Sequence, residues 1–223
     1  MTAIFAIIFI VIINILMFFL TRLLFNKEIT KKTESFKEIK KILVLSLVLN
    51  MLLNFLLYLQ YQASLQFLSY VLLFTILILC SVIDFKYRII PNVIIFPGFI
   101  FALIISLFSN HISFSQSLSG FAFGFIPFLL IFTFLPGAIG GGDVKLIGMI
   151  GSFLGWHFIP SILLIACLLS VFINLILIFL KKVTIKSYFA FAPYLSIATY
   201  VVILDYINLN EIINMIIFIL DKL

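Results

Sequence analysis

The chain has 223 residues, of which 65% are hydrophobic and only 10% are charged. Soluble domains carry about 25% charged residues, so this composition excludes a soluble globular fold and indicates a protein that lies largely in lipid. The formal net charge of +6 does not indicate a nucleic-acid-binding protein, because seven of the 14 Lys and Arg residues lie between Arg22 and Lys41, beside apolar segments. Basic clusters at such positions set the orientation of membrane helices.

A helix needs about 20 apolar residues to cross the hydrocarbon core of a bilayer. The N-terminal segment lacks a basic region and a small-residue cleavage site, so we predict a retained first span rather than a signal peptide. A shorter apolar run at 146–159 predicts an eighth, short span, and the tail 209–220 is predicted to be a terminal or interfacial segment. The full-length apolar runs lie near 3–21, 42–60, 64–83, 89–108, 118–136, 160–180 and 187–204.

These runs predict an all-α fold, a polytopic bundle of about eight transmembrane helices. The positive-inside rule orients the bundle if the loop 22–41 is cytoplasmic, because the loops 84–88 and 137–145 then lie on the same side. With the short span included, 13 of the 14 basic residues face the cytoplasm. The N-terminus and the loop 109–117, which contains His111, are then predicted to lie outside.

The chain is predicted to form one membrane domain, with no internal repeat and no separate soluble domain. Its parts are the N-terminal spans 1–63 with the basic loop 22–41, a core at 64–205, and an apolar tail at 206–223. The loop is amphipathic and is expected to be a helical segment near the lipid surface, with a docking site for a substrate as the alternative.

Cys80 and Cys167 are the two cysteines, and both lie within apolar runs. They form no CxxC pattern, so we interpret both as small hydrophobic residues and predict neither a metal site nor a cofactor.

Between Ile42 and Leu180 the chain has only five formally charged residues, and they form two small clusters. A charge at membrane depth costs roughly 2.5–3.5 kcal/mol on insertion scales, so charges there usually have a function. Both clusters fall on the predicted cytoplasmic face, so two carboxylates 59 positions apart can meet in space. The five residues are Asp84, Lys86, Arg88, Asp143 and Lys145.

The first cluster is the segment SVIDFKYRIIPN, residues 81–92. Pro91 suits the start of the following helix, where a missing N–H is harmless, and Asn92 can serve the local turn. The structural alternative is a helix boundary at which Lys86 or Arg88 neutralises Asp84 at the membrane interface.

The second cluster is the segment LPGAIGGGDVKLIG, residues 135–148, in which Gly140, Gly141 and Gly142 precede Asp143. A glycine run permits backbone conformations and close approaches that other residues forbid, as is needed beside a reacting group. The structural alternative is a flexible loop in which Asp143 caps a helix. A phosphate-binding loop does not fit, because the GxxxxGK[ST] pattern is absent.

Two carboxylates that share a site cannot both ionise easily, so one stays protonated. The ionised one can take a proton from water, while the protonated one hydrogen-bonds the scissile carbonyl and assists the leaving amine. No nucleophilic triad competes, because His111 falls on the opposite face and Trp156 and His157 are interpreted as interfacial anchors.

At these residues the chain resembles the type 4 prepilin peptidases, a family of membrane aspartic proteases. The first family motif corresponds to Asp84, Arg88, Ile90, Pro91 and Asn92, and the second, GGxDxK, to Gly141, Gly142, Asp143 and Lys145. A weaker aromatic-small-Pro element corresponds to Phe191, Ala192 and Pro193. The resemblance covers roughly residues 64–200.

The resemblance implies that Asp84 and Asp143 are the catalytic pair, with supporting roles for Lys86, Arg88, Lys145 and the neighbouring Pro and Gly residues. It implies prepilin or pseudopilin substrates, whose short basic leader ends in Gly before a hydrophobic helix, and cleavage at the cytoplasmic edge of the cell membrane. Pilus assembly, type II secretion and DNA uptake all use such substrates. The paired CxxC motifs of many family members are absent, so proteolysis without N-methylation is expected.

Two other functions remain open at this stage. A presenilin-like intramembrane protease also uses a Gly-x-Gly-Asp element but pairs it with a Tyr-Asp motif, whereas Ile83 precedes Asp84 here. A proton- or ion-coupled transporter would also place carboxylates at membrane depth, although the chain lacks two similarly interrupted repeats.

Overall fold

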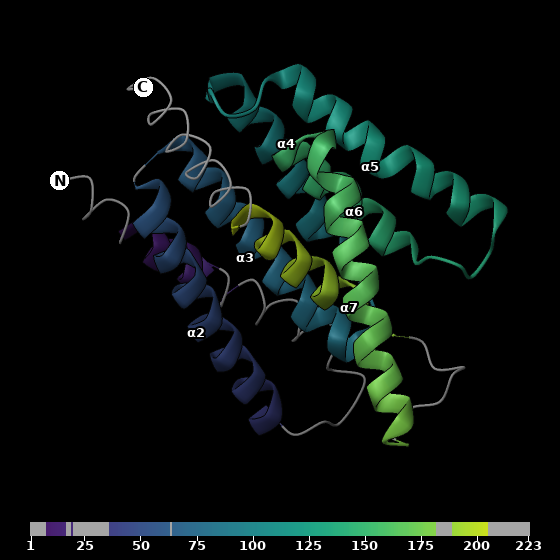
Figure 1. The fold of residues 1–223 in the computed structure, drawn as a ribbon. Helices are drawn as coiled ribbons and strands as arrows, with labels where there is room; N and C mark the ends of the chain where they lie inside the picture. Colours follow the sequence, from purple (N-terminus) through teal and green to yellow (C-terminus); the bar gives the residue numbers. More distant parts are fainter. Residues whose placement is uncertain (1–7, 17–18, 20–35, 63, 182–188, 205–223) are drawn as a thin grey trace, which may run out of the picture.

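The computed structural model describes residues 8–16, 19, 36–62, 64–181 and 189–204, and the following description is limited to them. These residues are helical with short connections and contain no β-strand, so the prediction of an all-α fold is confirmed (Figure 1). The helices are 8–16, α2 (Phe36–Tyr61), α3 (Leu65–Tyr87), α4 (Asn92–Phe108), α5 (Phe114–Phe134), α6 (Gly141–Leu154), the 3₁₀ turn η1 (Trp156–Phe158), α7 (Ile159–Phe179) and Ala192–Leu204.

Three segments of the described chain are long and apolar enough to cross a membrane: α3, α5 and the continuous stretch Trp156–Phe179. Shorter apolar helices occur at Val44–Leu59, Asn92–Phe108 and Ala192–Leu204. The chain is therefore a membrane protein, as its composition predicted. Most of the basic loop 22–41, Lys182, Lys186 and the tail 209–220 lie outside the described residues.

Helix boundaries differ from the prediction at two places that matter for the site. Helix α2 begins at Phe36, within the segment predicted as a loop, and α3 continues to Tyr87. Asp84 therefore lies in the last turns of α3 rather than in a loop 84–88. Helix α3 continues past Asp84 because its C-cap is Arg88, four residues later. Arg88 adopts a left-handed backbone conformation, with φ 55°.

Helix α5 also begins earlier than predicted, at Phe114, within the segment expected to be a loop. The hydroxyl of Ser113 accepts a hydrogen bond from the backbone N–H of Gln116, and the Gln116 side chain accepts one from the Ser113 N–H. This capping box is encoded by Ser-x-x-Gln and fixes the start of the helix.

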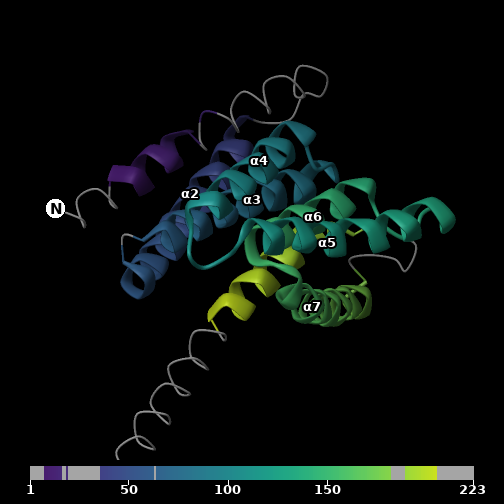
Figure 2. The ribbon, with the colours of Figure 1, turned by 90° about the horizontal axis from the view of Figure 1, so that it is seen from above.

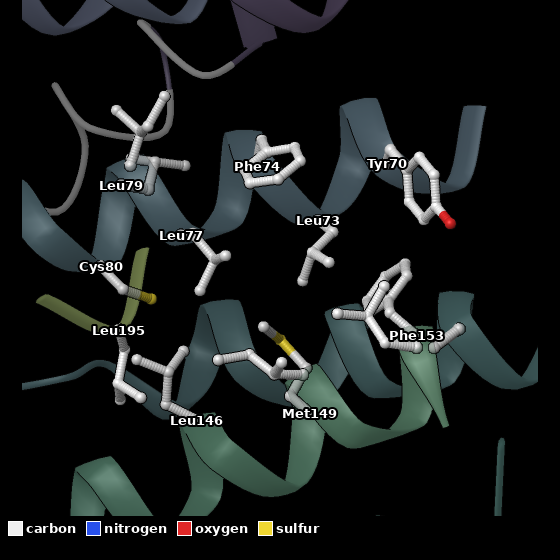
Figure 3. Close-up of a cluster of buried hydrophobic side chains, with 14 of the residues drawn as sticks. Tyr70, Leu73, Phe74, Leu77, Leu79, Cys80, Leu146, Met149, Phe153 and Leu195 are labelled. Carbon is white, nitrogen blue, oxygen red and sulfur yellow. The ribbon is translucent and has the colours of Figure 1, made fainter. Parts of the chain in front are cut away.

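Helix α3 is the centre of the bundle. In its apolar window 67% of the residues are buried, against 17% for α5. Its side chains meet those of α6 and of the helix Ala192–Leu204 in one apolar core (Figure 3), to which α3 contributes Leu73 and Leu77, α6 contributes Leu146 and Met149, and the last helix contributes Leu195.

Glycines bring α5 and α6 into close contact. A Cβ atom on Gly120 would overlap the carbonyl oxygen of Gly151, and a Cβ atom on Gly124 would lie 2.7 Å from that of Ile147. The hydroxyl of Ser117 donates a 2.6 Å hydrogen bond to the Ser152 carbonyl across the same contact. These small residues are thus used for helix packing within the chain.

Successive helices run in alternating directions, so the bundle has two distinct ends (Figures 1 and 2). The aspartate end holds Asp84 and the start of α6. At the histidine end, the rings of Tyr70 and His111 lie 5.9 Å apart. Tyr70 and Asp84 belong to the same helix, so 14 residues at about 1.5 Å each separate the two ends by roughly 21 Å.

Candidate active site

Asp84 is buried at the aspartate end, with 6% of its surface exposed. Its carboxylate Oδ2 accepts a 3.1 Å hydrogen bond from the backbone N–H of Ala192, and the backbone of Phe191 donates to it as well. The Arg88 guanidinium also acts on this carboxylate electrostatically. Two segments more than 100 residues apart in sequence therefore hold the Asp84 side chain in one orientation.

Asp143 lies in the first turn of α6, three residues after the N-cap Gly140. The backbone of Gly140 acts on the Asp143 carboxylate, but Asp143 is the third residue of α6 and Gly140 is the N-cap, so the structural alternative of an Asp that caps a helix from a flexible loop is not what the structure has. This contact does not account for the whole side chain, because its Oδ1 is buried and has no hydrogen-bond partner among the described residues. A buried carboxylate oxygen of this kind is available to a water molecule or a substrate.

The start of α6 is pressed against the start of α4, and this contact brings the two aspartates together. A Cβ atom on Gly142 would lie 2.9 Å from the Cβ of Ile90, closer than real Cβ atoms approach. Beside it, the Lys145 Nζ donates a 2.9 Å hydrogen bond to the Asn92 Oδ1. The glycine run therefore serves a close approach between segments.

The carboxylates of Asp84 and Asp143 lie close enough to interact electrostatically. Asp143 lies outside the segments predicted to span the membrane. Its burial, and secondly the neighbouring Asp84 carboxylate, raise the pKa of Asp143 to about 7. Near neutral pH the pair therefore retains a proton, as two adjacent acids require.

The other predicted site residues lie around the two aspartates, and each makes a contact of its own. Pro91 is the N-cap of α4, in the position predicted for it. Lys86 Nζ lies 5.9 Å from the centre of the Tyr87 ring. A Cβ atom on Gly141 would meet the ring of Phe132 at 3.3 Å, so α5 also closes on the glycine run.

Two contributions were not predicted from the sequence as parts of the site. The backbone of Phe191 and Ala192 binds Asp84, and the Phe-Ala-Pro element was the signal for it, although no role was attached to that element. Asn92 was expected to serve the local turn, whereas its side chain accepts from Lys145. A side-chain pair 53 residues apart leaves no local signal in the sequence.

A cavity of about 750 Å³ lies at the histidine end and is lined by His111, Gln116, His157 and Ser161, among others. It is separated from the aspartate pair by the length of α3, so the two histidines do not take part in the site. Within the described residues, no three His, Cys, Asp or Glu side chains come together.

Both aspartate clusters fall within one family match. Residues 71–175 match the type IV leader peptidase family, and this stretch contains Asp84 and Asp143 with their neighbouring motifs. Over these residues the chain is similar to the type IV leader peptidase family. Both Asp84 and Asp143 lie in the part of the chain that carries this similarity.

Curated relatives agree with the family match. The prepilin leader peptidase/N-methyltransferase of Dickeya chrysanthemi is 30% identical over 143 residues, which is 62% of this chain and 50% of the relative. The protein of the same description from Pseudomonas aeruginosa is 29% identical over 125 residues, 54% of this chain and 43% of the relative. The chain thus matches about half the length of these relatives. The comparison with solved structures gave no match.

Proposed function

We propose that the chain is a membrane aspartic endopeptidase that removes the short leader from prepilin- or pseudopilin-like substrates. The observation that carries the proposal is the pair of the buried Asp84 and the half-buried Asp143, in which the first carboxylate accepts a hydrogen bond from a backbone N–H and the second keeps a buried oxygen without a partner among the described residues. The similarity of residues 71–175 to the type IV leader peptidase family supports leader peptides as the substrate class.

The pair would act by general acid–base catalysis on a water molecule. The ionised carboxylate removes a proton from the water, which attacks the scissile carbonyl, while the protonated one donates a hydrogen bond to the carbonyl oxygen. The proton then passes to the leaving amine. Because the two acids are coupled, the shared proton belongs to the pair rather than to one residue.

The proposed setting is the cytoplasmic border of the cell membrane, with about eight spans and the N-terminus outside. Lys86, Arg88, Lys145 and Lys181 all lie at the same end of the bundle as the aspartates, and positive charge marks the cytoplasmic side. A substrate with a basic leader before a hydrophobic helix presents its scissile bond at this depth.

Proteolysis is the activity proposed for this chain, without methylation of the new N-terminus. The proposal rests on the absence of a CxxC pattern from the sequence. Incubation of the protein with a cleaved pilin and a labelled methyl donor would test it, and incorporation of label would contradict it.

The central experiment is coexpression of the full chain with a prepilin-like substrate and measurement of leader removal by gel shift and by N-terminal sequencing. We expect Asp84→Asn and Asp143→Asn each to abolish detectable processing, because losing one member of an acid pair commonly costs a factor of 10⁴ or more. Asp205→Asn removes a carboxyl outside both clusters and is the matched control.

Processing that survives in both variants would contradict the proposal. Cleavage mapped inside the hydrophobic span of the substrate, rather than at its border, would instead support an intramembrane protease of the presenilin type.

A further inference from the structure

An apolar groove of about 370 Å³ lies on the outside of the bundle between α2, α3 and the helix Ala192–Leu204. In Figure 1 the last of these helices is drawn in yellow in front of α3, and ring contact between Phe74 and Tyr200, at 5.1 Å, confirms that the two lie side by side. Leu49 forms part of the α2 wall of the groove, and it is 48% exposed.

One end of the groove lies about one helical turn from Asp84. Ser81, in its α3 wall, precedes Asp84 by three residues, and Pro193, in the opposite wall, follows the residue whose N–H binds Asp84. From Ser81 the groove extends along α3 to Phe74, which is seven residues or about 10 Å from Ser81 on the side away from Asp84. The groove therefore runs from the site toward the middle of the bundle.

The surface of the groove is apolar although serines line it. The hydroxyl groups of Ser81 and Ser196 lie 2.6 Å apart, so one donates to the other, and the second donates to a backbone carbonyl, that of Leu77 for Ser81 or that of Ala192 for Ser196. Their polar atoms are thereby satisfied within the bundle. Small side chains at a membrane-helix interface permit another helix to approach closely.

We propose that this groove binds the hydrophobic helix of the substrate, namely the turns that directly follow the scissile bond. This inference rests on the proposed function. A prepilin-like substrate becomes helical and apolar just after the cleaved bond, so these turns must leave the acid pair along an apolar surface. The groove begins at Ser81 and Pro193, close to Asp84, has an apolar surface and offers small side chains for helix packing.

Binding is tested by photocrosslinking in membranes with an Asp84→Asn background, which prevents turnover. A photoreactive benzoylphenylalanine is placed at Leu49, or at Met51 as the matched control. Both positions are exposed, at 48% and 54%, but Met51 points about 200° away around α2 and does not line the groove. We expect crosslinks to the apolar helix of the substrate from position 49 and not from position 51.

Activity provides the second measurement, with the Asp84 side chain intact. Leu49→Trp partly fills the groove and should lower cleavage of a membrane-inserted substrate about tenfold, the scale at which pockets discriminate small changes in bulk. Cleavage of a short peptide that ends soon after the scissile bond should change less than twofold on the same scale. Met51→Trp should leave both activities unchanged.

The outcomes separate the groove from the catalytic proposal. If the wild-type chain cleaves neither substrate, the proposed function fails. If it cleaves the substrate while Leu49→Trp behaves like Met51→Trp, and position 49 crosslinks only to lipid or to this chain, the groove proposal fails and the catalytic one stands.

Discussion

Asp143 combines, at the scale of one residue, a contact at the start of a helix with the catalytic role that we propose for it. The Gly140 backbone acts on its carboxylate, and its Oδ1 is buried without a partner among the described residues. Deleting such a group from a structural cap normally costs about 1 kcal/mol, whereas deleting it from an acid pair removes the reaction. Stability and activity measurements on one variant therefore distinguish the two roles.

The pH dependence follows from the raised pKa of Asp143, about 7. As the pH rises through this value the proton of the pair is lost, both carboxylates become charged, and the general acid disappears. We expect kcat/KM for a leader peptide to fall about tenfold for each pH unit above about 7.5. A rate that stays constant up to pH 9 would contradict the assignment.

The pH dependence of folding stability provides a control for the raised pKa of the Asp143 carboxyl. Its pKa in the folded protein lies above the value of about 3.9 in an unfolded chain, so the folded state loses stability as the pH rises from about 4 to about 7 and levels off above that. This slope in the thermal midpoint should diminish in Asp143→Asn.

Gly142 allows a second prediction at the scale of one residue. Gly142→Ala places a Cβ atom 2.9 Å from the Cβ of Ile90 and should push α6 away from α4. We expect processing to fall severalfold because a shift of about 1 Å at a reacting pair can cost up to 100-fold. The double variant Gly142→Ala/Ile90→Gly removes the clash and should recover part of the activity. Failure of the second change to recover any activity would show that the clash is not the cause.

At the scale of helices, α6 is positioned by its contacts with α5 and α4. Gly120 and Gly151 bring the α5 and α6 backbones together, while Gly142 and Lys145 fix the first turn of α6 against the start of α4. The helix has only 14 residues and ends at Gly155, where φ is +85°. A short helix held at both ends places Asp143 with little freedom.

Gly120→Val tests this packing. The new side chain would overlap the carbonyl of Gly151, and overpacking of this kind costs roughly 1–3 kcal/mol. We expect a lower thermal midpoint in detergent and reduced processing. Leu118→Val changes an exposed side chain on the same helix and is the control. Equal midpoints for the two variants would argue against the α5–α6 contact as a source of stability.

At the scale of the whole molecule, the two ends of the bundle differ in charge and chemistry. The aspartate end carries the acid pair with Lys86, Arg88 and Lys145, and the histidine end carries His111 and His157. This polarity is the basis of the proposed orientation, in which the aspartate end faces the cytoplasm.

Cysteine labelling tests the orientation. In a background without Cys80 and Cys167, a cysteine replaces Ala138 at the aspartate end or Asn110 at the histidine end, both of which are exposed. We expect a membrane-impermeant maleimide to label position 110 in intact cells and position 138 only after the membrane is opened. The reverse pattern would overturn the proposed topology.

Much of the fold could be predicted because lipid imposes a simple rule on the sequence. A run of about 20 apolar residues must become a helix, since no water is present to bond its backbone. The run 160–180 became α7, Ile159–Phe179, for this reason. Helix ends were less predictable, since the cap at Arg88 and the capping box at Ser113 depend on local hydrogen bonds rather than on hydropathy.

The sequence by itself singled out the residues to which we assign the proposed role, because an apolar chain has few charges and Asp84 and Asp143 stand out among them. Tertiary structure alone decided how they meet. The backbone N–H of Ala192 reaches Asp84 from 108 residues away, and the Lys145–Asn92 pair fixes α6 against α4. Hydropathy is a property of each segment and can be read along the chain. A contact between distant segments depends on how helices pack, and packing is a property of the whole bundle.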